Sequence, residues 1–240
     1  MKLTRRERSW AFYDWANSAY TIMVTTAVFP LFYKEYLAAD LPGYQSTGQL
    51  GYANSIATLV LAVLAPVIGS FADVRGAKRK FFLVFLLLGA GAAALLGLSG
   101  RGDWQPALWI YILSAIGFAG ANLVYDSFLT DVTTPERMDR VSARGYALGY
   151  IGGSTIPLVL ALMLILNAER LGFAGPFQAT AFTFPMIALW WIGFTLPMLR
   201  NVHQMYGIER KPRIVLDAFR RLGKTAKDIF FMFFLFLNIS

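Results

Sequence analysis

Residues 50–80 read LGYANSIATLVLAVLAPVIGSFADVRGAKRK, and this stretch decides the fold class. From Leu50 to Ala72 the stretch carries no charge. Its length exceeds the roughly 20 apolar residues that an α-helix needs to cross a bilayer. The uncharged run ends at Asp73, and a basic loop follows directly. An apolar run of membrane length next to a basic loop is the pattern of a transmembrane helix.

Composition points the same way for the whole chain. Hydrophobic residues make up 57% and charged residues 15% of the 240 positions, against roughly 25% charged residues in an average soluble chain. The net charge of +8 could suggest nucleic acid, but the basic residues stand in short runs between apolar stretches. We therefore expect a lipid bilayer and no nucleic acid as partner. The absence of cysteine excludes disulfide and thiol chemistry.

Five further stretches have the length and apolar character of a membrane span. They are Trp15–Tyr33, Phe81–Gly100, Pro106–Tyr125, Gly145–Asn167 and the longer Leu171–Leu199, of which roughly 20 residues would cross. The expected fold class is an all-α membrane protein, with a six-transmembrane-helix bundle over residues 1–200.

The basic residues predict the orientation of the bundle. Of the 22 Lys and Arg residues, all but Lys34, Arg101 and Arg170 fall on the side of the N-terminus. By the positive-inside rule, that side is cytoplasmic.

The last forty residues form two further segments. Residues 201–228 are a basic linker, in which Pro212 opens a stretch that fits an amphipathic helix on the anionic cytoplasmic leaflet. A short solvated helix or a disordered linker is the alternative. Residues 229–240 are apolar and too short to span a bilayer, so we expect the start of a truncated seventh transmembrane helix.

The loop after the second span has a composition suited to a conformational latch. Gly69 permits close helix approach, Gly76 permits a tight turn, and the acid at Asp73 can pair with nearby bases or with the N-terminus of another helix. The predicted gating residues are Gly69, Asp73, Arg75, Gly76, Lys78 and Arg79. An ordinary positive-inside loop is the alternative reading, since topology alone explains the basic residues.

This loop resembles the signature loop between helices two and three of the major facilitator superfamily, of pattern G-x-x-x-D-[RK]-x-G-[RK]-[RK]. Val74 and Ala77 depart from the pattern at two basic positions. Two other stretches, ERSWAFYDWANSAY (7–20) and DVTTPER (131–137) with VSARGYALGYIGG (141–153), resemble the vacuole-effluxer-like branch, also called the unidentified major facilitator family.

The resemblance implies the N-terminal half of a twelve-helix secondary transporter that works by alternating access. It implies a missing C-terminal six-helix half, a small-molecule substrate such as an amino acid, and amino acid efflux as known for fungal relatives. We expect a multi-pass protein of the bacterial inner membrane, with the proton as a candidate coupling ion.

Polar residues inside the spans predict one wall of a cavity. Asp14, Ser18 and Thr21 recur on one face of the first span, and such a stripe should avoid lipid. The resemblance implies that helices one and four line the central cavity. The candidate lining residues are Asp14, Asn17, Ser18, Thr21, Asn54, Asn122, Tyr125 and Asp126. Alternatively, Asp14 and Asp126 are hydrated, paired with Arg8 or Arg144, and structural or gating.

Other functions find less support in the residues. An integral membrane enzyme, such as a lipid or acyl transferase, needs a catalytic cluster at an interface. The chain has one histidine, His203 in the linker, and no paired carboxylates deep in a span. We expect no enzyme activity, no cofactor and no metal. No sequence feature supports a membrane scaffold.

Overall fold

The structure is a computed structural model that describes residues 2–209, 216, 217, 219, 220, 222–224 and 227. Apart from one isolated bridge between Val74 and Ile208, the described residues hold no β-structure. The elements are α1 (Arg5–Tyr20), η1 (Thr21–Thr26), α2 (Val28–Phe32), η2 (Tyr33–Leu37), α3 (Gly43–Ala72), α4 (Lys78–Leu96), α5 (Trp104–Ser127), α6 (Leu129–Val132), α7 (Pro135–Leu148), η3 (Gly149–Ser154), α8 (Thr155–Leu166), η4 (Glu169–Leu171) and α9 (Pro176–Asn201). The all-helical prediction is confirmed.

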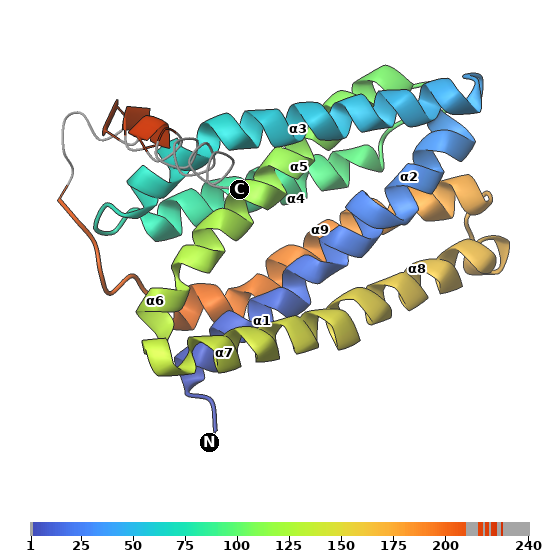
Figure 1. Cartoon of the computed structure of the whole chain (residues 1–240). Coiled ribbons are helices and arrows are strands. Elements are labelled where there is room, and N and C mark those ends of the chain that lie inside the picture. The colour runs from blue at the N-terminus through green and yellow to red at the C-terminus, as the bar shows by residue number, and fades with distance from the viewer. Residues whose placement is uncertain (1, 210–215, 218, 221, 225–226, 228–240) are drawn as a thin grey trace, which may run out of the picture.

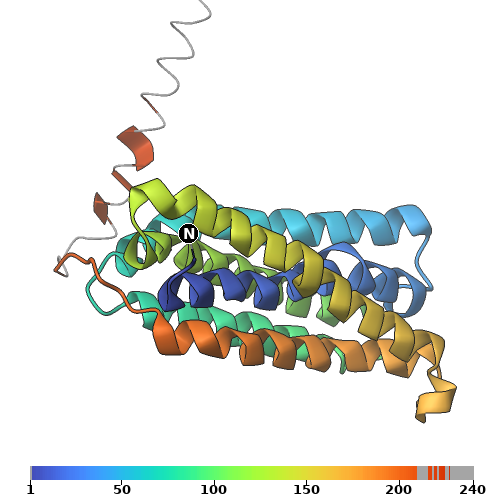
Figure 2. The ribbon, with the colours of Figure 1, turned by 90° about the horizontal axis from the view of Figure 1, so that it is seen from below.

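Five helical segments of the described chain are long and apolar enough to cross a membrane. They are Gly43–Ala72, Lys78–Leu96, Trp104–Val132, Pro135–Leu166 and Pro176–Asn201. Each overlaps one of the five spans predicted from Leu50 onward, with ends that differ by up to ten residues. The segments lie side by side as a bundle, which Figure 1 shows from one side and Figure 2 from below. The chain therefore folds as a helical membrane bundle.

The predicted first span, Trp15–Tyr33, is a broken helix rather than a continuous one. The π-helical turn η1 follows α1, and Ala27, with φ −123° and ψ −67°, separates it from the short α2. A second π-helical turn, η2, completes the path. Figure 1 shows α1 and α2 in blue running along the bundle. Because its segments are short, this stretch does not count among the five long apolar helices.

The fifth predicted span starts ten residues earlier than expected, at Pro135 rather than Gly145. The polar segment before Gly145 is helical too, since Pro135 occupies the first turn and Glu136 places a negative charge there. The π-helical turn η3 then joins α7 to α8. Most of the predicted amphipathic helix from Pro212, and the predicted helix start at residues 229–240, lie outside the described residues.

Glycines set the closest helix contacts. A Cβ at Gly89 of α4 would lie 2.9 Å from Phe118 N, and a Cβ at Gly117 of α5 would overlap the backbone of Gly89. Only glycine permits backbones to approach this closely. The glycines of the fifth span act in the same way: a Cβ at Gly153 would lie 2.7 Å from Trp15 O. This contact assigns Gly153 to helix packing.

Aromatic side chains fill the core between α1, α4, α5 and α9. Trp191 is fully buried and donates from Nε1 to Tyr13 Oη at 3.2 Å. Trp190 donates from Nε1 to Trp15 O at 3.3 Å. Trp191 therefore packs inside the bundle, and the half-buried Trp190 packs against α1. This packing holds α1 against α9.

Candidate functional site

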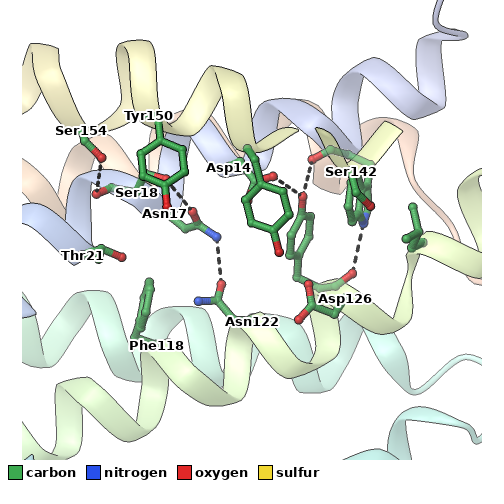
Figure 3. Close-up of a pocket in the computed structure, with 14 residues that line it drawn as sticks. Asp14, Asn17, Ser18, Thr21, Phe118, Asn122, Asp126, Ser142, Tyr150 and Ser154 are labelled. Atoms are coloured by element: carbon green, nitrogen blue, oxygen red, sulfur yellow. Dashed lines mark hydrogen bonds between the residues drawn. The ribbon is translucent and has the colours of Figure 1, made fainter. Parts of the chain in front are cut away.

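A cavity of about 470 Å³ lies between α1, α5 and the continuous helix formed by α7 and η3. Its lining is rich in polar and aromatic side chains, which Figure 3 shows in close-up. The lining residues are Trp10, Asp14, Asn17, Ser18, Thr21, Phe118, Asn122, Tyr125, Asp126, Leu129, Ser142, Tyr146, Tyr150 and Ser154. A volume of this size suits a small solute.

Helical spacing explains how each element contributes to the cavity. Asp14, Ser18 and Thr21 project from one face of the α1–η1 path, and Asn122 and Asp126 stand one turn apart on α5. From the third side, polar side chains recur at every fourth position along α7 and η3. These are Ser142, Tyr146, Tyr150 and Ser154.

Hydrogen bonds across the cavity join α1 to α5. Asn17 donates from Nδ2 to Asn122 Oδ1 at 2.9 Å, and Tyr125 Oη donates to Asp14 Oδ2 at 3.1 Å. Trp10 Nε1 donates to Tyr125 O at 3.1 Å. Figure 3 shows these bonds as dashed lines. Because buried polar groups need partners, the network fixes the positions of two amides and one carboxylate.

The two carboxylates of the cavity differ in their surroundings. Asp14 is buried and accepts the Tyr125 hydroxyl, whereas Asp126 is exposed and has neither an ion pair nor a hydrogen bond to a described residue. No Lys, Arg or His stands among the described residues that line the cavity. The alternative pairing with Arg8 or Arg144 is absent from the part of the chain that the structure describes.

The narrow gap between α1 and α7–η3 depends on glycine. A Cβ at Gly145 would overlap Asp14 Oδ2, and a Cβ at Gly149 would lie 3.1 Å from Asp14 O. A Cβ at Gly152 would overlap the Trp15 ring. These glycines bring the fifth span close enough to α1 for its tyrosines and serines to reach the cavity.

All the predicted cavity residues except Asn54 line this cavity. Asn54 instead accepts the Tyr111 hydroxyl at 2.6 Å and donates to Leu50 O at 3.2 Å, which joins α3 to α5. The row of Ser142, Tyr146, Tyr150 and Ser154 was missed. Its four-residue spacing is visible in the sequence, but none of its members carries a charge that would single the row out.

The predicted latch loop lies at the end of the bundle that also holds the N-terminus and the end of α9 (Figure 1). Gly76 has φ +76°, so the turn there favours glycine. Asp73, Arg75, Gly76 and Arg79 are exposed, and Asp73 forms no ion pair among the described residues. Gly69 on α3 has open space around it.

Lys78 pairs with Asp131, not with Asp73. Its Nζ lies 2.7 Å from Asp131 Oδ2, and both side chains are buried. Lys78 Nζ also donates to Ser127 O at 2.8 Å. A buried pair with further hydrogen bonds is costly to break, because removing one partner leaves the other charge uncompensated. The pair ties the start of α4 to α6.

The segment after α9 holds the loop around Asp73 in place through hydrogen bonds. Ile208 N donates to Asp73 O at 2.8 Å, and Arg75 N donates to Ile208 O at 3.0 Å. Gln204 accepts from Gly76 N at 2.9 Å and donates to Ala72 O at 3.1 Å. We call residues 202–208 the strap.

The strap is also bonded to Asp131. Backbone amides of Met205 and Tyr206 donate to Asp131 Oδ1 at 2.8 and 2.9 Å. Since its other oxygen accepts from Lys78, this one carboxylate joins α4, α6 and the strap. Sequence reasoning missed Asp131 and Gln204 because their partners lie 53 to 132 positions away in the chain.

A second ion pair joins the first helix to the start of α7. Arg137 binds Glu7 through two nitrogens at 2.7 Å each, and Thr133 Oγ1 donates to Glu7 Oε1 at 2.8 Å. The Arg137 guanidinium lowers the pKa of Glu7 to about 2 against the opposing effect of burial, and hydrogen bonds from Thr4 and Thr133 add to the lowering. The pair closes the same end of the bundle.

Comparison with known proteins relates the chain to a transporter family. Residues 44–237 match the family described as "Vacuole effluxer Atg22 like". A Bacillus subtilis (strain 168) protein named "Uncharacterized MFS-type transporter YxiO" is 48% identical over 230 residues, which cover 95% of this chain and 54% of that protein.

An uncharacterized protein of Aquifex aeolicus (strain VF5) is 28% identical over 153 residues, covering 64% of this chain and 37% of that protein. The chain thus spans about half the length of the Bacillus relative, and its match covers a smaller part of the Aquifex one.

Proposed function

The chain belongs to the vacuole effluxer Atg22-like family of major facilitator transporters, and we propose that it acts as the N-terminal half of a secondary transporter for a small solute. The observation that carries this proposal is the polar cavity between α1, α5 and α7–η3, inside a bundle of membrane-length helices. Polar and ionisable groups inside a membrane bundle are costly, so their presence marks a passage or a binding site.

We propose six spans, with the broken path from α1 to η2 as the first. Transporters place interrupted helices beside their substrate sites, where irregular backbone faces protein or water instead of lipid. η1 contributes Thr21 to the cavity, which fits such a role.

The excess of basic residues on the side of the N-terminus supports a cytoplasmic location for that end. Because the Bacillus and Aquifex relatives come from bacteria, we propose the bacterial inner membrane.

A C-terminal six-helix half is the proposed partner. The second half would close the open side of the cavity and permit alternating access between the two faces of the membrane. Amino acids are the proposed solute class, and the proton is the proposed coupling ion. The name of the family supports efflux as the direction of transport.

We propose that the loop around Asp73 and Gly76 acts as the latch of one conformation. Asp73 and Arg75 are exposed next to the strap, where a second half could reach them. A latch worth about 1–3 kcal/mol suffices to shift a two-state balance roughly 5- to 150-fold.

Flux in proteoliposomes tests transport directly. The complete gene product, reconstituted with an imposed proton gradient, should show uptake or efflux of a radiolabelled amino acid that ends when the gradient collapses. Asn17→Leu, which removes the hydrogen bond to Asn122, should reduce this flux. Gln178→Leu should not, because Gln178 lies at the start of α9 and outside the cavity lining. Turnover of a lipid or acyl substrate without any flux would instead favour a membrane enzyme.

A further inference from the structure

The composition of the cavity wall indicates which charge the solute carries. Resting on the proposed transport function, we propose that the cavity binds its solute through a protonated amine, with Asp126 as the carboxylate that meets the ammonium group. Asp14 supplies a second negative charge behind it. The inference names the substrate class of the site and would place amines, and amino acids at their amino end, among its ligands.

The first argument is the balance of charges around the cavity. Two carboxylates and no basic side chain stand among the described lining residues. Such a wall creates a negative potential in the cavity that concentrates cations and repels anions. A free carboxylate or phosphate would meet only hydroxyls and amides here, beside two like charges.

The second argument is that one of the two carboxylates is free to bind. Asp126 is exposed, and no described residue provides an ion pair or hydrogen bond to it. Figure 3 shows its side chain projecting from α5 into the space below α1. Asp14, in contrast, is held by the Tyr125 hydroxyl. An exposed carboxylate with no protein partner can accept charge-assisted hydrogen bonds from an ammonium group without breaking an existing contact.

The third argument is the aromatic content of the wall. The rings of Trp10, Phe118, Tyr125, Tyr146 and Tyr150 line the cavity together with the acids. Aromatic faces attract ammonium groups, and sites for alkylammonium ligands use this attraction. Rings also cover the apolar part of an amine. Tyr146 and Tyr150 are mostly exposed, so they can turn toward a ligand.

Matched pairs of small ligands separate the effects of charge and shape. The complete gene product, purified in detergent, is titrated calorimetrically at pH 7 with 2-phenylethylamine and 3-phenylpropionate, and with hexylamine and hexanoate. In each pair, an amine and a carboxylate carry a similar apolar group. We expect both amines to bind and both carboxylates to give no measurable heat of binding.

Variants assign the binding to Asp126. Asp126→Asn should weaken amine binding at least about tenfold, since it removes the charge and keeps the size of the side chain, whereas Asp126→Glu should retain most of it. Asp139→Asn is the matched control, because Asp139 is an exposed acid on α7 outside the cavity lining. Elution as a single species in size-exclusion chromatography checks folding. If Asp126→Asn does not fold, the ligand pairs on the unaltered protein decide the question.

Three results would overturn the inference: carboxylates that bind as tightly as the amines, no binding of either amine, or unchanged amine binding in a folded Asp126→Asn protein. The last result, combined with a loss of proton-driven flux, would assign Asp126 to the proton instead. Gradient-dependent flux of a neutral solute without amine binding would leave the transport proposal standing and remove only this one.

Discussion

At the scale of single residues, the ion pair between Glu7 and Arg137 gives the bundle a pH-dependent contribution to stability. A carboxyl whose pKa in the folded state is lowered from 4.5 to about 2 stabilises the fold above pH 4.5. This contribution is lost as the pH falls from about 4.5 to about 2, because the folded protein must then take up a proton that the unfolded chain already holds.

We expect Glu7→Gln to lower the melting temperature at pH 7 by several degrees, since the change leaves Arg137 with a weakened partner. The cost should be on the order of 1–3 kcal/mol. Between pH 5 and pH 3 the variant should lose less stability than the unaltered protein does. Fluorescence-detected melting over this range measures both effects.

The control for this prediction is Glu35→Gln, because Glu35 is exposed and forms no ion pair among the described residues. This variant should melt like the unaltered protein at each pH. If Glu7→Gln and the unaltered protein lose equal stability as the pH falls below 5, the Glu7–Arg137 pair does not cause this pH dependence.

Residue patterns predicted part of the candidate site, and physical reasons separate what was found from what was missed. Asp14, Ser18 and Thr21 were found because helical spacing and the cost of polar groups in lipid both single them out. Asp126 followed from the same cost. The Lys78–Asp131 pair could not be predicted, since it depends on where α4 meets α6 in space.

At the scale of helices, the contact between α4 and α5 depends on one face of α4. Gly89 faces the backbone of α5, whereas Gly91 on the same helix has open space around it. Gly89→Leu should therefore lower the melting temperature by several degrees or prevent folding, because overpacking a close contact costs about 1–3 kcal/mol.

Gly91→Leu is the matched control, with the same change two positions along the same helix. It should leave the melting temperature nearly unchanged. Equal destabilisation by both variants would show that loss of glycine, and not the contact between the helices, is responsible.

The strap makes a second prediction at this scale. Gln204→Ala removes the acceptor of Gly76 N and the donor to Ala72 O, each worth about 1 kcal/mol. Hydrogen exchange at Gly76, Arg75 and Ile208 should then accelerate about five- to thirtyfold, since losing one or both bonds costs about 1–2 kcal/mol and about 1.4 kcal/mol corresponds to a factor of ten. Mass spectrometry of peptides that cover residues 73–78 and 202–209 measures this rate.

Gln178→Ala is suitable as a control for the strap, because Gln178 also accepts from a backbone amide, Ala174 N, but at the other end of the bundle. Exchange in the two strap peptides should be unchanged in this variant. Unaltered exchange in Gln204→Ala would mean that Gln204 does not hold the loop.

The helices themselves were largely predictable, and their exceptions have local causes. Uncharged length predicted α3, α4, α5 and α9 because lipid imposes it. The extension of α7 to Pro135 was missed, since a polar helix that continues a span carries no hydropathy signal. The break at Ala27 was missed as well. Pro30 lies in the first turn of α2 and cannot donate to the carbonyl of Thr26, which favours a helix start just before it, but membrane spans also tolerate proline in their interior.

At the scale of the whole molecule, the uneven distribution of basic residues predicts how the bundle sits in the membrane. Residues 1–240 contain no cysteine, so single cysteines report on each end without background once any cysteine elsewhere in the complete gene product has been replaced by serine. Thr134 lies exposed before α7 at the end that holds the N-terminus, and Asp40 lies exposed between η2 and α3 at the opposite end.

A membrane-impermeant maleimide applied to intact spheroplasts should label Asp40→Cys and spare Thr134→Cys, which should react only after permeabilisation. This outcome follows if the basic end stays in the cytoplasm. Reaction of Thr134→Cys in intact cells would invert the topology, and the loop around Asp73 would then face outward. Equal labelling at both positions in intact cells would indicate leaky cells or mixed insertion, which a cytoplasmic marker protein distinguishes. Because the proposed latch and the strap lie at the same end as Thr134, this labelling also decides which side of the membrane they would close.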